Sequence, residues 1–481
     1  MADHSNVGDA PVPSLWDALS SADSGDGAVF DAADGRVALG ALAGASILNG
    51  ALESLRGKSL LLATREQFAT ALALLELDGV ARRVVLCTPD LKAGQLAEVA
   101  VTAEAEFMLI GADEGTDGSP AAALEAPAGL EIVRLAAQPI RQKLERRARV
   151  QTEWILLTSG TTGNPKLVLH TLATLGGTLP RRPAGPARTV WSTFYDIRRY
   201  GGLQIYLRAL LSGSSLVLSS SSECVVDFLA RAGSAGVTHI SGTPSHWRRA
   251  LMSGAAGRID PEYVRLSGEI ADQAVLDSLK AAYPRARVGH AFASTEAGVA
   301  FDVNDGLAGF PARFVDDGVA GIEMKVEDGT LRIRSGRNAQ RYLGDAAAPL
   351  ALVDGFVDTG DMVELVDGRY LFRGRKTGVI NVGGLKVHPE EVELILNGDP
   401  RVRMSLVRAR RNPITGAVVV ADVVLTDDAA DGAGPAELAT LGSDLLDACR
   451  RSLPAHKVPS ALRFVPALEL TAAGKLVRPG A

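Results

Sequence analysis

The sequence has few cysteines, and none at the spacing of a metal site. Only three occur among 481 residues, Cys87, Cys224 and Cys449, and they lie far apart. Three is an odd number for a disulfide framework, and no Cys-x-x-Cys pair is present. We therefore expect free thiols in a reducing compartment, which argues against a secreted disulfide scaffold.

The sequence also lacks an excess of either charge. Its 50 basic and 56 acidic residues give a formal net charge of −6, and the two signs are well mixed. This balance provides no basic surface for nucleic acid and no polybasic patch for a membrane. We therefore expect neither nucleic acid nor a membrane among the partners.

Long apolar runs are missing as well. No stretch of about 18 apolar residues is free of charges, so no transmembrane helix is expected. Residues 1–21 contain neither the basic segment nor the apolar segment of a signal peptide. The predicted location is cytoplasmic, and the sequence leaves the oligomeric state open.

What the sequence does contain is an alternation of apolar runs and helical patterns. A chain of 481 residues exceeds one core, because domains usually have about 100–200 residues. Strand–helix alternation predicts an α/β fold with a largely parallel sheet. The predicted strands are 59–63, 84–87, 107–110, 154–157, 215–218, 238–241 and 287–293. The predicted helices of this part are 67–77, 224–232 and 272–282.

The pattern changes near residue 321, where short β runs joined by Asp-Gly turns begin. A further α/β unit begins after Arg375, which predicts domains 1–375 and 376–481. The predicted strands beyond 321 are 322–326, 330–333, 362–365, 369–372, 403–408 and 418–425. The predicted helices there are 389–396 and 435–452, and the predicted polar segments of the chain are 1–25 and 112–128.

A segment rich in glycine and hydroxyl groups follows the apolar run 154–157. It comprises Thr158, Ser159, Gly160, Thr161, Thr162, Gly163, Asn164, Pro165 and Lys166. Glycines let the backbone fold tightly, so that N–H groups and hydroxyls converge on one anion, and the lysine adds a positive charge. A Walker A loop needs a second glycine where this segment has Pro165, which excludes a P-loop kinase or ATPase.

This segment resembles the phosphate loop of the adenylate-forming (ANL) superfamily of acyl- and aryl-CoA ligases, peptide-synthetase adenylation domains and luciferases. Other motifs of that family recur in the same order over residues 150–481, whereas the first 150 residues match only in their α/β pattern. The resemblance implies a large N-terminal domain of stacked α/β sheets with a small β region. It also implies a small, mobile α+β C-terminal domain.

The run His290 to Glu296 resembles the family motif for adenine and metal. By that resemblance Phe292 stacks on adenine, Thr295 contacts the α-phosphate and Glu296 holds Mg²⁺. Phenylalanine replaces the usual tyrosine here, and Ala293 replaces the usual glycine. The remaining ATP contacts implied in this region are Gly268, Glu269, Ala291 and Ser294.

Two later motifs are expected at the ribose and at the hinge. Asp358-Thr359-Gly360-Asp361 resembles the ribose motif, in which Asp361 accepts from both hydroxyls. Arg375 resembles the arginine that also contacts ribose or phosphate. Thr377 falls at the hinge of the C-terminal domain, where the family usually has aspartate or lysine.

The segment from Asn381 to Glu393 resembles the loop that reaches the active site for thioester formation. Gly383 and Gly384 permit close backbone approach, and Lys386 follows them. The spacing of this segment is more typical of acyl-CoA ligases than of peptide-synthetase domains. CoA is therefore the expected thiol.

A lysine near the end of the chain completes the set. Leu470 to Arg478 resembles the C-terminal catalytic-lysine motif, in which Lys475 bridges the substrate carboxylate and the α-phosphate. Such a lysine stabilises negative charge as it develops in the transition state. The resemblance assigns catalysis to Lys475, Lys166, Glu296 and Thr295.

In this family the acid pocket comes largely from the stretch after the phosphate loop. Here that stretch contains Asp196, Arg198 and Arg199, and Gly242 lies further along. The two arginines could bind a second carboxylate of the substrate or a phosphate of CoA, or they could be surface residues of a helix. Asp196 could instead hold an α-amino group.

These motifs predict activation of a carboxylic acid by ATP·Mg²⁺ as an acyl-adenylate, followed by transfer to CoA. One alternative keeps the first step and loads a separate carrier protein with an acyl or amino acid. A second alternative is a non-catalytic nucleotide-binding homologue, although Lys166, Glu296, Asp361 and Lys475 are all present. The sequence does not identify the acid.

Overall fold

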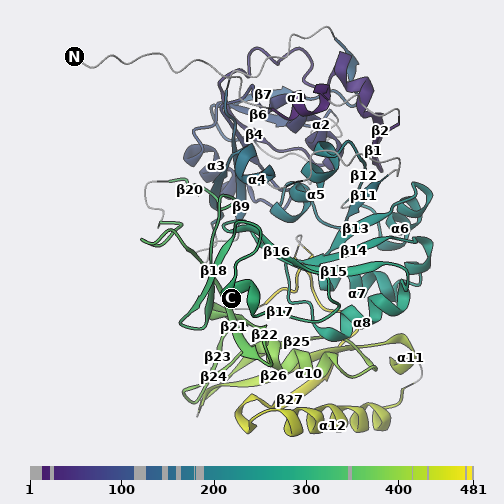
Figure 1. Cartoon of the computed structure of the whole chain (residues 1–481). Helices are drawn as coiled ribbons and strands as arrows, with labels where there is room; N and C mark the ends of the chain where they lie inside the picture. Colours follow the sequence, from purple (N-terminus) through teal and green to yellow (C-terminus); the bar gives the residue numbers. More distant parts are fainter. Residues whose placement is uncertain are drawn as a thin grey trace. The chain divides into compact units, whose positions relative to one another are not determined.

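The computed structural model separates the chain into two compact units (Figure 1). The first comprises residues 1–189, 197–220 and 339–349, and the second comprises 190–196, 221–338 and 350–481. The structure describes residues 14–21, 27–112, 126–142, 150–158, 164–177, 179, 189–220, 222–344, 349–413, 415–430, 433–471 and 474–478. Much of the predicted polar segments 1–25 and 112–128 lies outside these ranges. None of the helices described combines the length and apolar character needed to cross a membrane.

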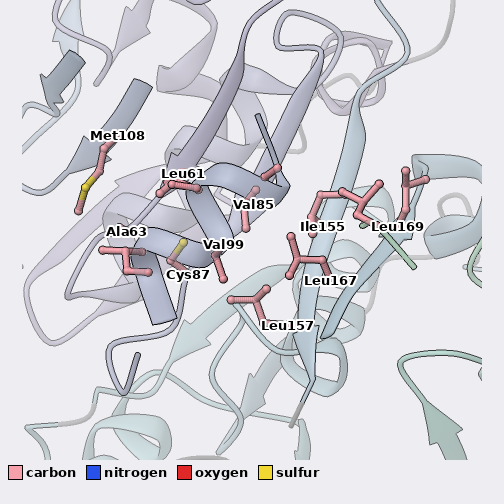
Figure 2. Packing of buried hydrophobic residues seen from close by; sticks show 14 of the residues in the cluster. Leu61, Ala63, Val85, Cys87, Val99, Met108, Ile155, Leu157, Leu167 and Leu169 are labelled. Atoms are coloured by element: carbon pink, nitrogen blue, oxygen red, sulfur yellow. The ribbon is translucent and has the colours of Figure 1, made fainter. Parts of the chain in front are cut away.

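The first unit is built on a sheet with the order β20-β10-β9-β5-β4-β6-β7. Its strands are β4 (Ser59–Leu62), β5 (Arg83–Leu86), β6 (Phe107–Ile110), β7 (Glu131–Arg134), β9 (Glu153–Thr158), β10 (Lys166–His170) and β20 (Arg341–Tyr342). Strands β9, β5, β4, β6 and β7 are parallel, as predicted, and β10 and β20 add antiparallel pairs at one edge. Figure 2 shows the apolar cluster on this sheet, to which Leu61, Val85 and Ile155 contribute fully buried side chains.

Helices and short strands complete the first unit. They are α1 (Leu15–Ser21), β1 (Val29–Ala32), β2 (Gly35–Ala38), η1 (Leu39–Gly44), β3 (Ala45–Ser46), α2 (Gln67–Leu77), α3 (Ala93–Thr102), β8 (Ile140–Arg141), α4 (Leu172–Gly176), α5 (Tyr200–Leu211) and β12 (Ser215–Leu218). Asp78, directly after α2, is buried and accepts from the Leu15 N–H at 2.8 Å and from Trp154 Nε1 at 3.0 Å. Burial raises the pKa of the Asp78 carboxyl to about 6.

The second unit contains a parallel sheet that carries the predicted nucleotide motifs. Its parallel strands are β11 (Val190–Thr193), β13 (His239–Gly242), β14 (Tyr263–Ser267) and β15 (Arg287–Ser294), and β16 (Gly298–Val303) pairs antiparallel to β15. The α-helices that the second unit contributes between these strands are α6 (Val225–Ser234), α7 (Pro244–Met252) and α8 (Gln273–Ala282). Gly242 is therefore the last residue of β13, and Gly268 and Glu296 follow the carboxyl ends of β14 and β15. That edge of a parallel sheet is where ligands usually bind.

The predicted β region is a five-stranded antiparallel sheet with the order β17-β22-β21-β19-β18. Its elements are β17 (Phe310–Pro311), α9 (Arg313–Asp316), β18 (Glu323–Glu327), β19 (Thr330–Arg334), β21 (Val357–Val366) and β22 (Arg369–Arg375). Asp328 and Gly329 have φ values of 54° and 74°, as a two-residue hairpin turn requires. The predicted Asp-Gly turn is therefore confirmed.

The C-terminal part of the second unit packs two helices on a three-stranded sheet, as Figure 1 shows at the yellow end of the chain. Its elements are η3 (Lys376–Gly378), β23 (Ile380–Val382), β24 (Leu385–Val387), α10 (Pro389–Asn397), β25 (Val402–Asn412), β26 (Gly416–Leu425), α11 (Asp427–Ala430), α12 (Pro435–Ser452), η4 (Ala455–Lys457) and β27 (Ala461–Phe464). The predicted α/β class with a smaller α+β C-terminal part is confirmed. The domain boundary after Arg375 stays a prediction.

The three cysteines are free thiols in different surroundings. Cys87 and Cys449 are buried, whereas Cys224 is exposed. Burial raises the pKa of the Cys87 thiol to about 12 and that of Cys449 to about 11. The expectation of free thiols is confirmed.

Candidate active site

The predicted phosphate loop is the connection of a β-hairpin in the first unit. Thr158 ends β9, Lys166 begins β10, and the two residues are directly paired across the hairpin. Lys166 is exposed, and its Nζ lies 5.0 Å from the centre of the Tyr342 ring. Strand pairing thus fixes the backbone of Lys166 at the point where the loop ends. Loop residues 159–163 lie outside the described part of the chain.

The adenine-and-metal motif spans the end of β15 and the turn to β16. Thr295 and Glu296 lie in this turn and are half-buried, and Ser294 Oγ accepts from the Ala297 N–H at 2.9 Å. Ala291 and Ala293 belong to β15. The turn therefore presents a hydroxyl and a carboxylate at the carboxyl edge of the parallel sheet.

Phe292 has ring partners within the protein. Its ring stacks on Phe372 with a centroid distance of 5.3 Å and an interplanar angle of 7°, and on Phe301 at 5.8 Å and 22°. These rings belong to the apolar core of the β region, where Phe292 is only partly buried. The stacking of Phe292 on adenine stays a prediction.

Asp361 and Arg375 come together on neighbouring strands. They are register partners of β21 and β22, and Arg375 Nε donates to Asp361 Oδ1 at 3.2 Å. Burial raises the pKa of the Asp361 carboxyl, while the charges of Arg375 and Lys475 act in the opposite direction. Three groups that the sequence predicts at the nucleotide therefore influence one another within the second unit.

Lys475 lies on a tight loop that approaches the β14–α8 connection. Leu470 and Leu476 form an antiparallel bridge, and the Gly474 N–H donates to the Thr471 carbonyl at 2.8 Å. Lys475 Cε would be 3.4 Å from a Cβ placed on Gly268. The structure thus brings together Gly268, Asp361, Arg375 and Lys475, which are distant in the sequence.

The loop contacts the start of α7. Thr243 Oγ1 donates to the Gly474 carbonyl at 2.8 Å and accepts the His246 N–H at 3.0 Å as the N-cap. The Thr243 N–H donates to His246 Nδ1 at 3.2 Å, and burial lowers the pKa of His246 to about 3, so the ring is neutral. Sequence analysis did not assign Thr243 a role, although Thr-Pro at a helix start is typical of an N-cap.

Gly474 itself fits closely against the His246 ring. Its φ is +68°, and a Cβ on Gly474 would lie 1.9 Å from both Cε1 and Nε2 of His246. No side chain fits into that gap without a shift of the ring or the loop. The residue before Lys475 is therefore glycine for two reasons, backbone conformation and space.

The four acid-pocket candidates have different surroundings. In the second unit Asp196 is half-buried, and a Cβ on Gly242 would lie 2.7 Å from the Phe194 ring. In the first unit Arg198 is buried and donates to the backbone carbonyls of Thr64 and Arg65. Arg199 precedes α5, and its Nη2 donates to both carboxylate oxygens of Asp90, at 2.7 and 2.8 Å.

One alternative was that the two arginines are surface residues of a helix. This does not hold for Arg198, which is buried and precedes the first residue of α5. Both guanidinium groups have protein partners that hold them in place. A role for either one at the substrate stays a prediction.

The residues predicted for thioester formation form a small exposed hairpin. Gly383 and Gly384 connect β23 to β24, and the Gly383 N–H donates to the Thr415 carbonyl at 2.9 Å. Lys386 is exposed on β24, and Thr377 is exposed in η3. These positions agree with a mobile hinge and an accessible loop, which remain predictions.

The donor set fits a magnesium ion held with a polyphosphate. Mg²⁺ usually takes one or two carboxylates, with phosphate and water oxygens completing its octahedron. Glu296 offers one carboxylate in a turn beside the Thr295 hydroxyl. Within the described ranges no three His, Cys, Asp or Glu side chains cluster as a complete protein cage, so a shared site is the arrangement that these residues suit.

Comparison with known families finds matches to two family models. The model of the family described as AMP-binding enzyme matches residues 60–338. A second model, described as the AMP-binding enzyme C-terminal domain, matches residues 391–475. Together they cover both the phosphate-loop hairpin and the Lys475 loop.

Individual proteins are also similar to this chain in sequence or in fold. A 2-succinylbenzoate–CoA ligase of Salmonella typhimurium is 30% identical over 259 residues, which span 52% of this chain and about half, 53%, of that relative. A protein of the same name in Bacillus licheniformis is 26% identical over 444 residues, 87% of this chain and 88% of the relative. The amide bond synthetase McbA of Marinactinospora thermotolerans has a similar fold, with a TM-score of 0.77, 19% identity and coverage of 96% of this chain and 98% of that one.

Proposed function

Because the chain belongs to the AMP-binding enzyme family, we propose that it activates a carboxylic acid with ATP and transfers the acyl group to CoA. The observation that carries this proposal is the position of Lys475 beside Gly268, within electrostatic reach of Asp361 and its partner Arg375. The names of the relatives, 2-succinylbenzoate–CoA ligases, support CoA as the acceptor. We also propose the cytoplasm as its location, because ATP and CoA occur there.

In the first half-reaction a carboxylate oxygen of the acid attacks the α-phosphorus of ATP, and pyrophosphate leaves. Lys475 and Thr295 stabilise the negative charge that develops around this phosphorus. Lys166, at the mouth of the phosphate loop, neutralises the departing pyrophosphate. Asp361 binds the ribose hydroxyls, and Arg375 keeps its carboxylate in place.

Magnesium, when bound to Glu296 and the phosphates, supplies charge neutralisation for the polyphosphate. The chain's own contribution is to hold the Glu296 carboxylate in the short turn after β15. Gly298 closes this turn, since a Cβ there would lie 2.7 Å from the Arg337 carbonyl. Thr295 and Glu296 are therefore held in a short backbone turn between β15 and β16.

In the second half-reaction the CoA thiolate attacks the acyl carbon, and AMP leaves with the bonding electron pair. We assign the exposed Gly383–Gly384 hairpin and Lys386 to the approach of CoA. The C-terminal domain, 376–481, rotates about Thr377 between the two half-reactions. The rotation removes the Lys475 loop from the active site and brings this hairpin there instead.

A screen of acids tests the proposal. Purified protein is incubated with ATP, Mg²⁺ and single acids, namely 2-succinylbenzoate and aryl, short-chain, long-chain and dicarboxylic acids. We expect acid-dependent release of pyrophosphate, and release of AMP in step with acyl-CoA only when CoA is added. If none of these acids increases the release of pyrophosphate, the proposed function is overturned.

A further inference from the structure

One carboxylate joins the Lys475 loop to the parallel-sheet part of the second unit. Glu269 Oε1 accepts the Leu476 N–H at 3.1 Å, and Glu269 Oε2 accepts the Ser245 N–H at 2.9 Å. A single side chain thus joins the residue after Lys475 to the first turn of α7.

The first turn of α7 suits a carboxylate. Ser245 is the second helical residue after the Thr243 N-cap, so its N–H has no partner within the helix. The positive end of the helix dipole also favours a negative charge at this point. Glu269 therefore has a fixed position before the Lys475 loop binds to it.

A second bond holds the loop on the other side of Lys475. The Gly474 carbonyl accepts from Thr243 Oγ1 at 2.8 Å. Gly474, directly before the lysine, is thus bonded to the N-cap of α7, and Leu476, directly after it, is bonded to Glu269, which itself accepts from the first turn of α7. Together the two bonds determine where the lysine backbone lies and hence where its ammonium group can reach.

The far end of the loop is bonded to the C-terminal part of the chain. Arg478 donates to both carboxylate oxygens of Glu393 on α10, at 2.8 and 2.7 Å. The loop also has its own internal bonds, including Lys475 N–H to Thr471 Oγ1 at 3.2 Å. It is therefore a preformed piece of the C-terminal part, which Glu269 and Thr243 hold against the sheet.

We infer that Glu269 is a positioning residue that acts through Leu476 to hold Lys475 in place for acyl-adenylate formation. Its side chain binds the loop rather than the nucleotide, whereas sequence analysis predicted Glu269 only as part of the ATP site. Thr243 has the same role on the other side of the lysine. This inference rests on the proposed function, which it refines by separating the requirements of the two half-reactions.

Amide hydrogen exchange tests the contact without any substrate. Glu269→Gln keeps the size of the side chain but leaves only one acceptor oxygen for two N–H groups. We expect faster exchange in peptides that cover residues 470–478, and no change in Glu262→Gln, an exposed glutamate just before β14. Unchanged exchange at residues 470–478 in folded Glu269→Gln protein would refute the contact.

Separate assays of the two half-reactions test the consequence. We expect Glu269→Gln to slow acid-dependent pyrophosphate exchange by about tenfold or more, and to slow thioester formation from supplied acyl-adenylate much less. Thr243→Val should behave similarly, and Thr243→Ser, which keeps the hydroxyl, should restore most of the exchange. Melting temperatures near that of the wild type would show that the variants fold.

Three outcomes are distinguishable. Equal loss of both half-reactions, or no loss of pyrophosphate exchange, would overturn the positioning role. If the wild-type protein shows no pyrophosphate exchange with any acid, the proposed function fails and the role in adenylation fails with it. In that case hydrogen exchange still decides whether Glu269 binds the loop.

Discussion

Lys166 and Lys475 are both expected at the phosphates of ATP, but the protein holds them in different ways. Lys166 begins a strand that pairs with β9 over five residues of continuous register, next to a fully buried apolar core. Lys475 lies on a loop with one β-bridge, bonded to Thr243 and Glu269. The backbone of the first lysine cannot move without breaking a sheet, whereas that of the second can.

The hydrogen bonds that hold the Lys475 loop are weak enough to be broken during the reaction. A hydrogen bond between neutral groups contributes about 1 kcal/mol, and one to a charged group about 1.5–3 kcal/mol. The bonds from Thr243 and Glu269 therefore hold the Lys475 loop by roughly 2–4 kcal/mol. An attachment of that strength can form for one half-reaction and break for the next.

The largest expected effect comes from removing the two lysines in turn. Lys475→Ala should reduce acid-dependent pyrophosphate exchange by about 100- to 1,000-fold or more, since it removes a charge that acts on the transition state. Thioester formation from supplied acyl-adenylate should persist, because the loop has left the site by then. Half-reaction assays measure both, and undiminished pyrophosphate exchange would refute the assignment of Lys475.

Lys166→Ala provides the contrast in the same assays. Its charge acts on the pyrophosphate part of ATP, so the KM for ATP should rise while the second half-reaction stays near the wild-type rate. A loss in Lys166→Ala confined to the second half-reaction would contradict the division between the two lysines.

The next effect concerns the stability of the first unit. Burial raises the pKa of Asp78 in the folded protein to about 6, so the fold favours the protonated form. The contribution of Asp78 to the free energy of unfolding is therefore greatest below about pH 4 and declines as the pH rises to about 6. Between pH 4 and 7 the unfolding free energy of the wild type should fall by roughly 2 kcal/mol relative to Asp78→Asn.

Urea unfolding of both proteins across this pH range measures that difference. The ratio of the two half-reaction rates serves as the control, because Asp78 contacts Leu15 and Trp154 rather than the site residues. A difference in unfolding free energy that does not vary with pH would show that the fold does not raise the pKa of Asp78.

The smallest of the three effects is expected from Gly474→Ala. The added methyl group meets the His246 ring, so the loop must shift and pyrophosphate exchange should slow by about tenfold, the equivalent of 1.4 kcal/mol. Gly416→Ala is the matched control, because its φ of +75° is similar but no neighbouring heavy atom lies within 4 Å of the new group. Equal effects of the two substitutions on pyrophosphate exchange would exclude the collision as the cause.

Much of the fold could be predicted from local pattern. Helices α2 and α12 begin and end at the predicted residues. Helix α2 is a mostly apolar, almost wholly buried segment, and α12 begins at Pro435 directly after its glycine N-cap. Strand β7 was missed because it lies at the edge of its sheet, where one of its four residues is buried and no apolar run forms. Strand β10 was missed because its first residue also belongs to the phosphate-loop motif.

The site could be predicted only in part. Resemblance to family motifs predicts Asp361 at the ribose and Arg375 at the ribose or phosphate, which stays a prediction, and the structure shows that the two side chains are hydrogen-bonded to each other. The bonds of Thr243 and Glu269 to the Lys475 loop join residues more than 200 positions apart, and no local spacing encodes them. The same is true of Arg198, which donates to the backbone carbonyls of Thr64 and Arg65, just after the end of β4.

The close fit of Gly474 against His246 limits which substitutions these two positions can accept during evolution. The ring at 246 excludes a side chain at position 474, so a smaller residue at 246 must come first, and the φ of +68° at 474 still restricts which residues can follow. Substitutions should therefore accumulate in that order among descendants of this chain. The two positions are expected to covary although they lie in different family segments.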